Sequence, residues 1–156
     1  MRNLAWLILL ASFFTGCGSR ETVLEKKQAG NFIEEATVLL KKGNVIEAVK
    51  IFQKEIVRNP QDTQAPFILA QLLMQLGNYP VAVAYFKRVI ELEPDNGRAY
   101  LLLGGCYDLQ GEKDEAILNV QKSVQIFNQQ RDEQNFKQSV VILHSLVESK
   151  NKPVMN

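Results

Sequence analysis

The stretch from Gly77 to Pro94, GNYPVAVAYFKRVIELEP, predicts a single amphipathic helix whose two ends are both marked. Val83, Phe86 and Ile90 recur at helical spacing, which places them on one face. Pro80 stands near the start of the helix, where the missing N–H of proline costs nothing. The opening glycine can end a preceding helix in the left-handed conformation, and the closing proline is typical of residues just after a helix. The stretch therefore predicts helix, tight turn and helix in succession.

Several residue types of this stretch recur at positions 34 residues before it and 34 residues after it. Five columns keep that step: Gly43, Gly77 and Gly111; Ala48, Ala82 and Ala116; Ala36, Ala70 and Gly104; Pro60 and Pro94; and Phe52 and Phe86, with Val120 in the third place. A fixed period of this length indicates a repeat architecture, in which stacked hairpins bury the apolar faces that one hairpin cannot bury alone.

The period and the columns resemble those of the tetratricopeptide repeat family. The second helix of that repeat is similar to Gly77–Pro94, and its first helix and turn are similar to Arg98–Gly111, RAYLLLGGCYDLQG. The resemblance covers residues 29–130 in three copies, 29–62, 63–96 and 97–130. It implies an all-α superhelix of helical hairpins. Asn128 departs from the pattern, because it stands where the third copy would have its closing proline.

Residues 131–150 are expected to form a last helix that caps the stack. Terminal repeats need a polar outer face, and the apolar side of this helix would consist of Phe136, Val140, Leu143 and Val147. The alternative is that this helix begins a fourth repeat. Residues 151–156 are expected to be a tail.

The N-terminal residues are expected to be a targeting signal and not part of the folded domain. Leu4–Phe14 is a run of eleven uncharged residues, too short to span a bilayer, which needs about 20, but typical of a secretory signal. The segment that follows, Phe14-Thr-Gly-Cys17, resembles the bacterial lipobox. The resemblance implies that residues 1–16 are cleaved off, that Cys17 carries acyl chains such as palmitate, and that residues 17–28 form a tether. The alternative is an ordinary cleaved signal with an incidental cysteine.

Acylation at Cys17 would hold the mature chain at a membrane, because two or more acyl chains anchor a protein durably. Gly18 follows the cysteine, and in Gram-negative lipoproteins the absence of aspartate there resembles the default sorting to the outer membrane, facing the periplasm. In a Gram-positive cell the same signal would place the chain on the outer face of its single membrane.

Composition argues against several classes of function. Lys and Arg number 18 against 17 for Asp and Glu, so there is no basic excess for nucleic acid. The sequence has one histidine, His144, so a histidine-rich metal site is not expected. We expect the His144 side chain to be partly packed. Cys106 is expected to pack as a small apolar residue. No nucleophile with a base and no phosphate-cradling loop is apparent, so we expect no catalytic residue, no cofactor and no small-molecule substrate.

The family resemblance implies that the first helices of successive repeats line a concave groove that binds protein. The columns of that groove fall on Ile33, Thr37, Leu40, Gln64, Phe67, Gln71, Met74, Arg98, Leu101 and Asp108, with Gly105 among them. Family members that bind the tails of chaperones clamp a terminal carboxylate with Lys, Asn and Arg, but only Arg98 fits that chemistry here. An amphipathic helix or an apolar extended segment suits the predicted groove better.

Three functional hypotheses follow. The first is a membrane-anchored scaffold for protein–protein interaction in the cell envelope. The second is a pilotin-like factor, because tetratricopeptide lipoproteins help the secretin of type IV pilus systems to assemble, although those relatives usually carry more repeats. The third is a structural lipoprotein that associates with itself through the groove or the last helix. The sequence does not separate these hypotheses.

Overall fold

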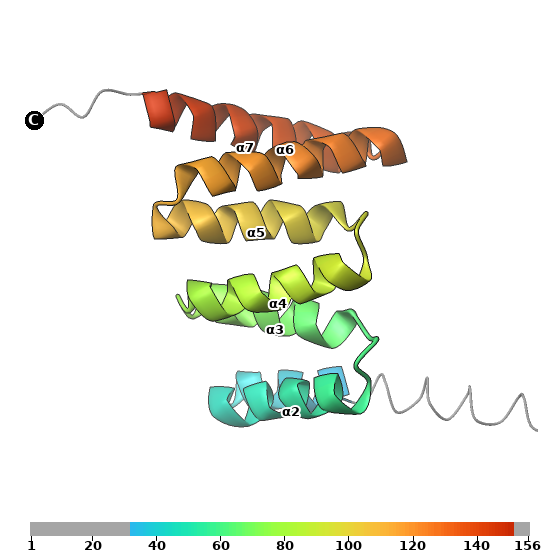
Figure 1. Ribbon diagram of the computed structural model, residues 1–156. Helices are drawn as coiled ribbons and strands as arrows, with labels where there is room; N and C mark the ends of the chain where they lie inside the picture. Colours follow the sequence, from blue (N-terminus) through green and yellow to red (C-terminus); the bar gives the residue numbers. More distant parts are fainter. Residues whose placement is uncertain (1–31, 152–156) are drawn as a thin grey trace, which may run out of the picture. The chain divides into compact units, whose positions relative to one another are not determined.

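The computed structural model describes residues 32–151, and all regular elements among these residues are helices. After a helical stretch at residues 32–41, the elements are α2 (Val45–Arg58), α3 (Gln64–Gln75), α4 (Tyr79–Leu92), α5 (Gly97–Gln110), α6 (Lys113–Gln130) and α7 (Glu133–Asn151), as Figure 1 shows. The chain divides into two compact units between Ile51 and Phe52, inside α2. The predicted all-α fold is confirmed.

Several predictions fall outside the described residues. These are the signal at residues 1–16, the acylated Cys17 with its tether at 17–28, and the tail beyond residue 151. Within residues 32–151, none of the helices is both long enough and apolar enough to cross a membrane.

The first unit holds one helical hairpin. Residues 32–41 are helical, Gly43 adopts a left-handed conformation with φ of 79°, and α2 begins two residues later. Two alanines of the 34-residue columns, Ala36 and Ala48, are fully buried. The predicted pattern of helix, glycine turn and helix is therefore present here too.

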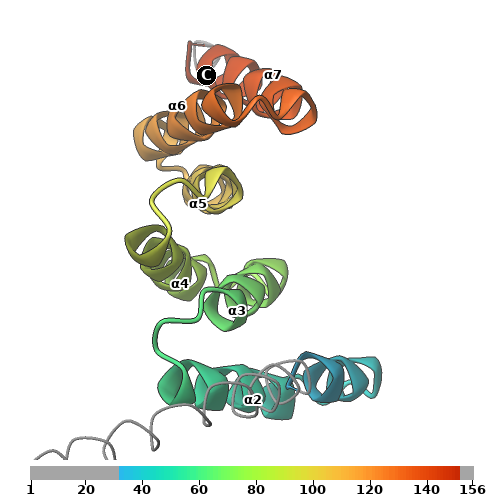
Figure 2. The same ribbon diagram turned by 90° about the vertical axis from the view of Figure 1, so that its right-hand side faces the viewer.

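The second unit is a stack in which each helix packs on the one before it. The pairs α3 and α4, α4 and α5, α5 and α6, and α6 and α7 are in contact, and α3 also touches α5 across the intervening helix. Figure 2 shows α3 and α7 on the same side of this stack, with α5 between them along its length. The first helices of the hairpins thus share one face of the unit.

The turns inside the hairpins follow one hydrogen-bond pattern. Gly77 and Gly111 have φ of 76° and 82°, and their amides donate to the carbonyls of Met74 and Asp108, three residues back. A positive φ is strained for residues with a side chain, which explains the 34-residue glycine column. The turn from α6 into α7 has the same bonds, but its left-handed residue is Arg131, with φ of 57°.

The hairpin of α5 and α6 depends on a close approach at Gly104. A Cβ built there would lie 2.6 Å from Val120 Cγ2 and 3.0 Å from the carbonyl oxygen of Ala116. Cys106 is fully buried in the same helix, as predicted. α6 extends to Gln130 and is 18 residues long against 14 for α4, because Asn128 replaces the proline that would have ended it.

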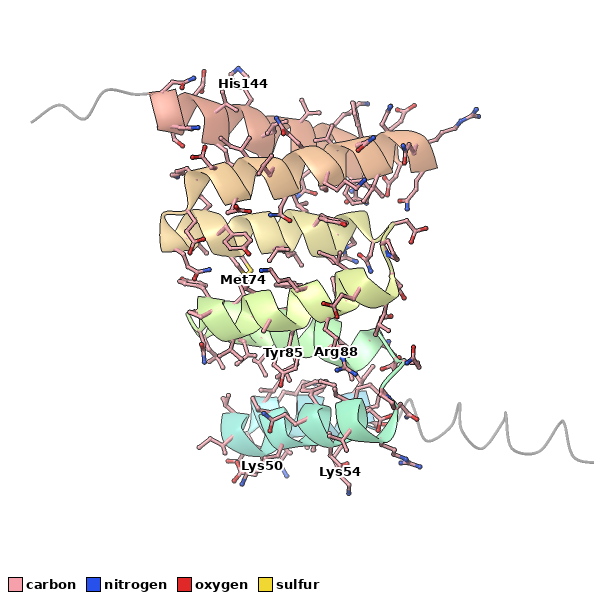
Figure 3. All side chains as sticks on the ribbon, in the orientation of Figure 1. Lys50, Lys54, Met74, Tyr85, Arg88 and His144 are labelled. Carbon is pink, nitrogen blue, oxygen red and sulfur yellow. The ribbon has the colours of Figure 1, made fainter. Side chains whose placement is uncertain are left out.

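Two of the four residues predicted for the apolar side of the last helix, Phe136 and Leu143, are half-buried, and the other two are exposed. Val140 and Val147 are exposed by 39% and 38%, whereas Ser139 and Leu146 are buried. The hydroxyls of Ser123 in α6 and Ser139 in α7 lie 3.2 Å apart and share a buried hydrogen bond. Both serines are fully buried, and an apolar pattern does not reveal this polar contact between α6 and α7. Figure 3 shows His144 pointing away from α6, and its side chain is 73% exposed, so it is not partly packed as expected.

Candidate functional site

The predicted groove residues of the first unit lie on the helical stretch at residues 32–41. Ile33 and Leu40 are half-buried and Thr37 is exposed. The Thr37 hydroxyl donates to the carbonyl of Ile33 at 2.6 Å, one helical turn back. This bond occupies the only donor of the Thr37 side chain.

In the second unit, the first helices surround a hollow of about 220 Å³. Its walls come from α3, α5 and α7, and its lining residues are Gln71, Arg98, Leu101, Leu102, Asn135 and Gln138. Three of these, from α3 and α5, were predicted from the sequence. The lining combines one cation, three primary amides and two leucines. The hollow therefore offers hydrogen-bond donors, hydrogen-bond acceptors and apolar surface at one place.

Arg98 is held at the edge of this hollow by an aromatic pair. Its guanidinium carbon lies 5.7 Å from the centroid of the Phe67 ring, a cation–π distance. Phe67 meets Phe86 of α4 edge to face, with centroids 5.9 Å apart and planes at 74°. Because Phe86 is fully buried, the stack fixes Phe67, and Phe67 in turn orients the exposed Arg98.

Met74 lies further along α3 and points toward α5 (Figure 3). Its Cε would be 3.2 Å from a Cβ at Gly105, so the missing side chain of Gly105 makes room for the methionine. Met74 is half-buried, and its flexible thioether can follow the shape of an apolar ligand.

Four predicted residues of this unit, including Phe67 and Met74, are not among those that line the hollow; the other two are Gln64 and Asp108. Gln64 is exposed at the first position of α3. Asp108 is half-buried near the end of α5 and forms an ion pair with Lys113 at the start of α6. Its carboxylate therefore has a partner within the hairpin.

Sequence reasoning missed Leu102, Asn135 and Gln138. The last two come from α7, which was interpreted as a cap and given no groove positions. Asn135 is fixed in place by Asp132, which caps α7: the Asn135 backbone N–H donates to one carboxylate oxygen at 3.1 Å and its side-chain amide to the other at 2.6 Å. Treating residues 131–150 as the first helix of a further hairpin would have identified this wall.

The pKa values of two ionisable groups in this unit, Asp132 and Cys106, are shifted from their usual values. Hydrogen bonds from the side chain and backbone of Asn135 lower the pKa of Asp132 below its usual value. Burial raises the pKa of the Cys106 thiol to about 11, so at neutral pH it is not a nucleophile. Across residues 32–151, no three His, Cys, Asp or Glu side chains come together as a metal site would require.

The sequence pattern of the tetratricopeptide repeat matches residues 33–90 and, in an overlapping second match, residues 69–131. This chain belongs to the tetratricopeptide repeat family. The two matches together span the hairpins described above, including the α3 and α5 walls of the hollow.

Curated relatives of this chain are much longer proteins. It is 28% identical over 86 residues to the BBSome complex member BBS4 of Bos taurus, which is 55% of this chain but 17% of that one. It is 33% identical over 73 residues to Superkiller complex protein 3 of Mus musculus, 47% of this chain and 5% of that one. The chain thus spans less than a fifth of these relatives.

Solved structures share the fold over nearly their whole length. PcrH, solved in complex with the chaperone binding region of PopD, superposes with a TM-score of 0.73 at 16% identity, covering 81% of this chain and 96% of PcrH. The type III secretion translocator chaperone SycD of Yersinia enterocolitica gives 0.73 at 16%, covering 88% and 97%. The TPR2B domain of yeast Sti1, in a complex with pHsp70, gives 0.70 at 20%, covering 79% and 98%.

Proposed function

We propose that this chain is a protein-interaction module that holds an extended segment of a partner protein in the hollow between α3, α5 and α7, and that acyl chains on Cys17 keep it at the surface of the cell envelope. The observation that carries the first part is the lining of the hollow, where Arg98, Gln71 and two amides of α7 surround Leu101 and Leu102.

The chemistry of the lining favours an extended peptide over an apolar helix. Primary amides donate and accept hydrogen bonds, so Gln71, Asn135 and Gln138 suit the free N–H and C=O groups of an extended main chain, which a helix has already satisfied. Arg98 adds a preference for an acidic side chain, and the leucines add a pocket for an apolar one. PcrH and SycD, which share the fold, are solved in complex with the chaperone binding region of PopD and with a peptide of the translocator YopD, respectively.

Photo-crosslinking in living cells tests this site. A photoreactive amino acid at Gln71 or at Gln138 places the probe on two opposite walls of the hollow, and the same probe at Gln121, exposed on α6, is the matched control. We expect one dominant adduct from both wall positions and not from the control. Equal adducts from all three positions, or none above the control, would refute the site.

The identity of that adduct also decides among cellular roles. A secretin subunit would place the chain in a pilotin-like role, whereas an enzyme or assembly factor of the cell wall or outer membrane would make it an adaptor. Anchoring raises the effective concentration of the chain near such partners, so a modest affinity in the hollow is sufficient.

The anchor is tested separately. Cells grown with an alkyne-tagged fatty acid should label the native chain, and Cys17→Ser should remove the label and leave an uncleaved precursor. Cys106→Ser is the matched control and should label normally, because that thiol is buried. Labelling of the Cys17→Ser variant would disprove the lipobox interpretation while leaving the hollow untouched.

A further inference from the structure

The outward face of α7 carries apolar side chains that no described element covers. Val141 is 69% exposed, and Val140 and Val147 are exposed by 39% and 38%. α5 packs on α4 and on α6, whereas the main packing partner of α7 among the described helices is α6. A terminal helix that only caps a stack presents a polar outer face, so valines at this place indicate a surface that pairs with something.

The residues opposite the buried side of α7 form a single stripe. Ser139 and Leu146 define the buried side. At 3.6 residues per turn, Lys137, Val141, His144 and Glu148 all project from the opposite side, because they are spaced by four, three and four residues. Their side chains are exposed, including Lys137 at 75%, His144 at 73% and Glu148 at 62%.

This stripe is complementary to itself in the antiparallel direction. If two copies of α7 cross with a two-fold axis midway between Val141 and His144, Lys137 of each copy faces Glu148 of the other. Val141 then faces His144, and Gln134 faces Asn151. Within a single chain, Lys137 lies 3.4 Å from Glu133, and Glu148 lies 3.6 Å from His144. Both pairs are one turn apart on α7 itself. Val140 and Val147 would flank the axis and extend the apolar contact.

We propose that this face of α7 binds a second copy of the chain as an antiparallel, two-fold symmetric helix pair. Closed two-fold pairing is the commonest form of self-association, and it requires a self-complementary patch such as this one. One helix pair is a small interface, so we expect a weak dimer whose dissociation constant is micromolar or higher. The α7 residues that line the hollow, Asn135 and Gln138, do not belong to this stripe.

Sedimentation equilibrium of the full chain in density-matched detergent tests the proposal. We expect a concentration-dependent dimer. Lys137→Glu should weaken it about fivefold or more, because two like-charged contacts replace two attractive ones. Lys137→Glu combined with Glu148→Lys should restore the original affinity, which only a direct contact between these positions explains.

Two further variants separate this face from the rest of the molecule. Val141→Arg places two cations beside the axis and should abolish the dimer. Val57→Arg, at an 82% exposed valine of α2, is the matched control and should leave it unchanged. Circular dichroism checks that each variant folds. A monomer at all concentrations, a dimer that survives Val141→Arg, or a charge swap that fails to rescue Lys137→Glu would each overturn the proposal.

Discussion

Burial of the Cys106 side chain controls how fast its thiol reacts. With a pKa raised to about 11, only about one thiol in a thousand is ionised at pH 8. We therefore expect Cys106 of a Cys17→Ser chain to react with a disulfide reagent at pH 8 far more slowly than a small-molecule thiol. The rate should rise to that of an exposed thiol in denaturant. Rapid reaction of the folded chain would show that the helix around Cys106 opens readily.

The two adjacent glycines of α5 offer a matched test of packing. Gly104→Ala should destabilise the fold by about 1–3 kcal/mol, because its Cβ would collide with Val120 and with the backbone oxygen of Ala116. At Gly105, a Cβ would meet only the mobile end of Met74, and alanine is the better helix former, so Gly105→Ala should be neutral or stabilising. Urea titration measures both variants. Equal losses would mean that both substitutions act on the helix backbone and not on packing.

At the scale of elements, the buried serine pair joins α6 to α7. Ser139→Ala leaves the Ser123 hydroxyl buried without its partner, so we expect a loss of about 1–2 kcal/mol in the free energy of unfolding. The double variant Ser123→Ala with Ser139→Ala should lose less than the sum of the single variants, because it removes both polar groups. Urea titration of the three variants gives the coupling energy. Strictly additive losses would show that the hydroxyls do not interact.

Asp132 makes the start of α7 sensitive to acid. Hydrogen bonds to Asn135 lower the folded-state pKa of Asp132, so its stabilisation is present above the unfolded value of about 3.9 and is lost as the pH falls through the lower folded value. Asp132→Asn keeps an oxygen that can accept from the backbone but cannot titrate. The difference in melting temperature between the native chain and this variant should therefore shrink as the pH falls from 6 to 2. A difference that does not change with pH would rule out this cap as an acid-sensitive contact.

The elements that were predictable are those in which backbone geometry limits the residue type. Gly77 and Gly111 mark left-handed turns, and Pro94 follows a helix end, so the hairpins could be read from spacing. The α3 and α5 walls were implied by the resemblance to the tetratricopeptide repeat. The orientation of α7 could not be read from spacing, because the residues that it buries include Ser139, and a search for apolar spacing selects Val140 instead. The α7 side of the hollow, with Asn135 and Gln138, was not expected because residues 131–150 were interpreted as a cap.

At the scale of the whole molecule, α7 contributes to two surfaces and to the stability of the stack. A chain that ends at Gln130 would expose the face of α6 that α7 covers, including the buried Ser123. Repeat arrays gain stability from each interface between neighbours. We expect this truncated chain to unfold at a lower urea concentration with a smaller dependence on urea, because less surface is buried. An unchanged midpoint would show that α7 is dispensable for folding.

The length of α6 also determines where this array could be extended by protein engineering. The end of α6 does not match a consensus repeat, because α6 is four residues longer than α4 and the turn after it is built on Arg131. A consensus repeat added at that end would therefore be out of register with the array. The junction before Gly97 is regular: Asn96 caps α5 by accepting from the Ala99 amide at 2.9 Å, and Glu93 links Asn96 to Thr63. A whole 34-residue module inserted between Asn96 and Gly97 would keep the specialised C-terminal end intact, which makes this junction the place to lengthen the binding surface without redesigning its last wall.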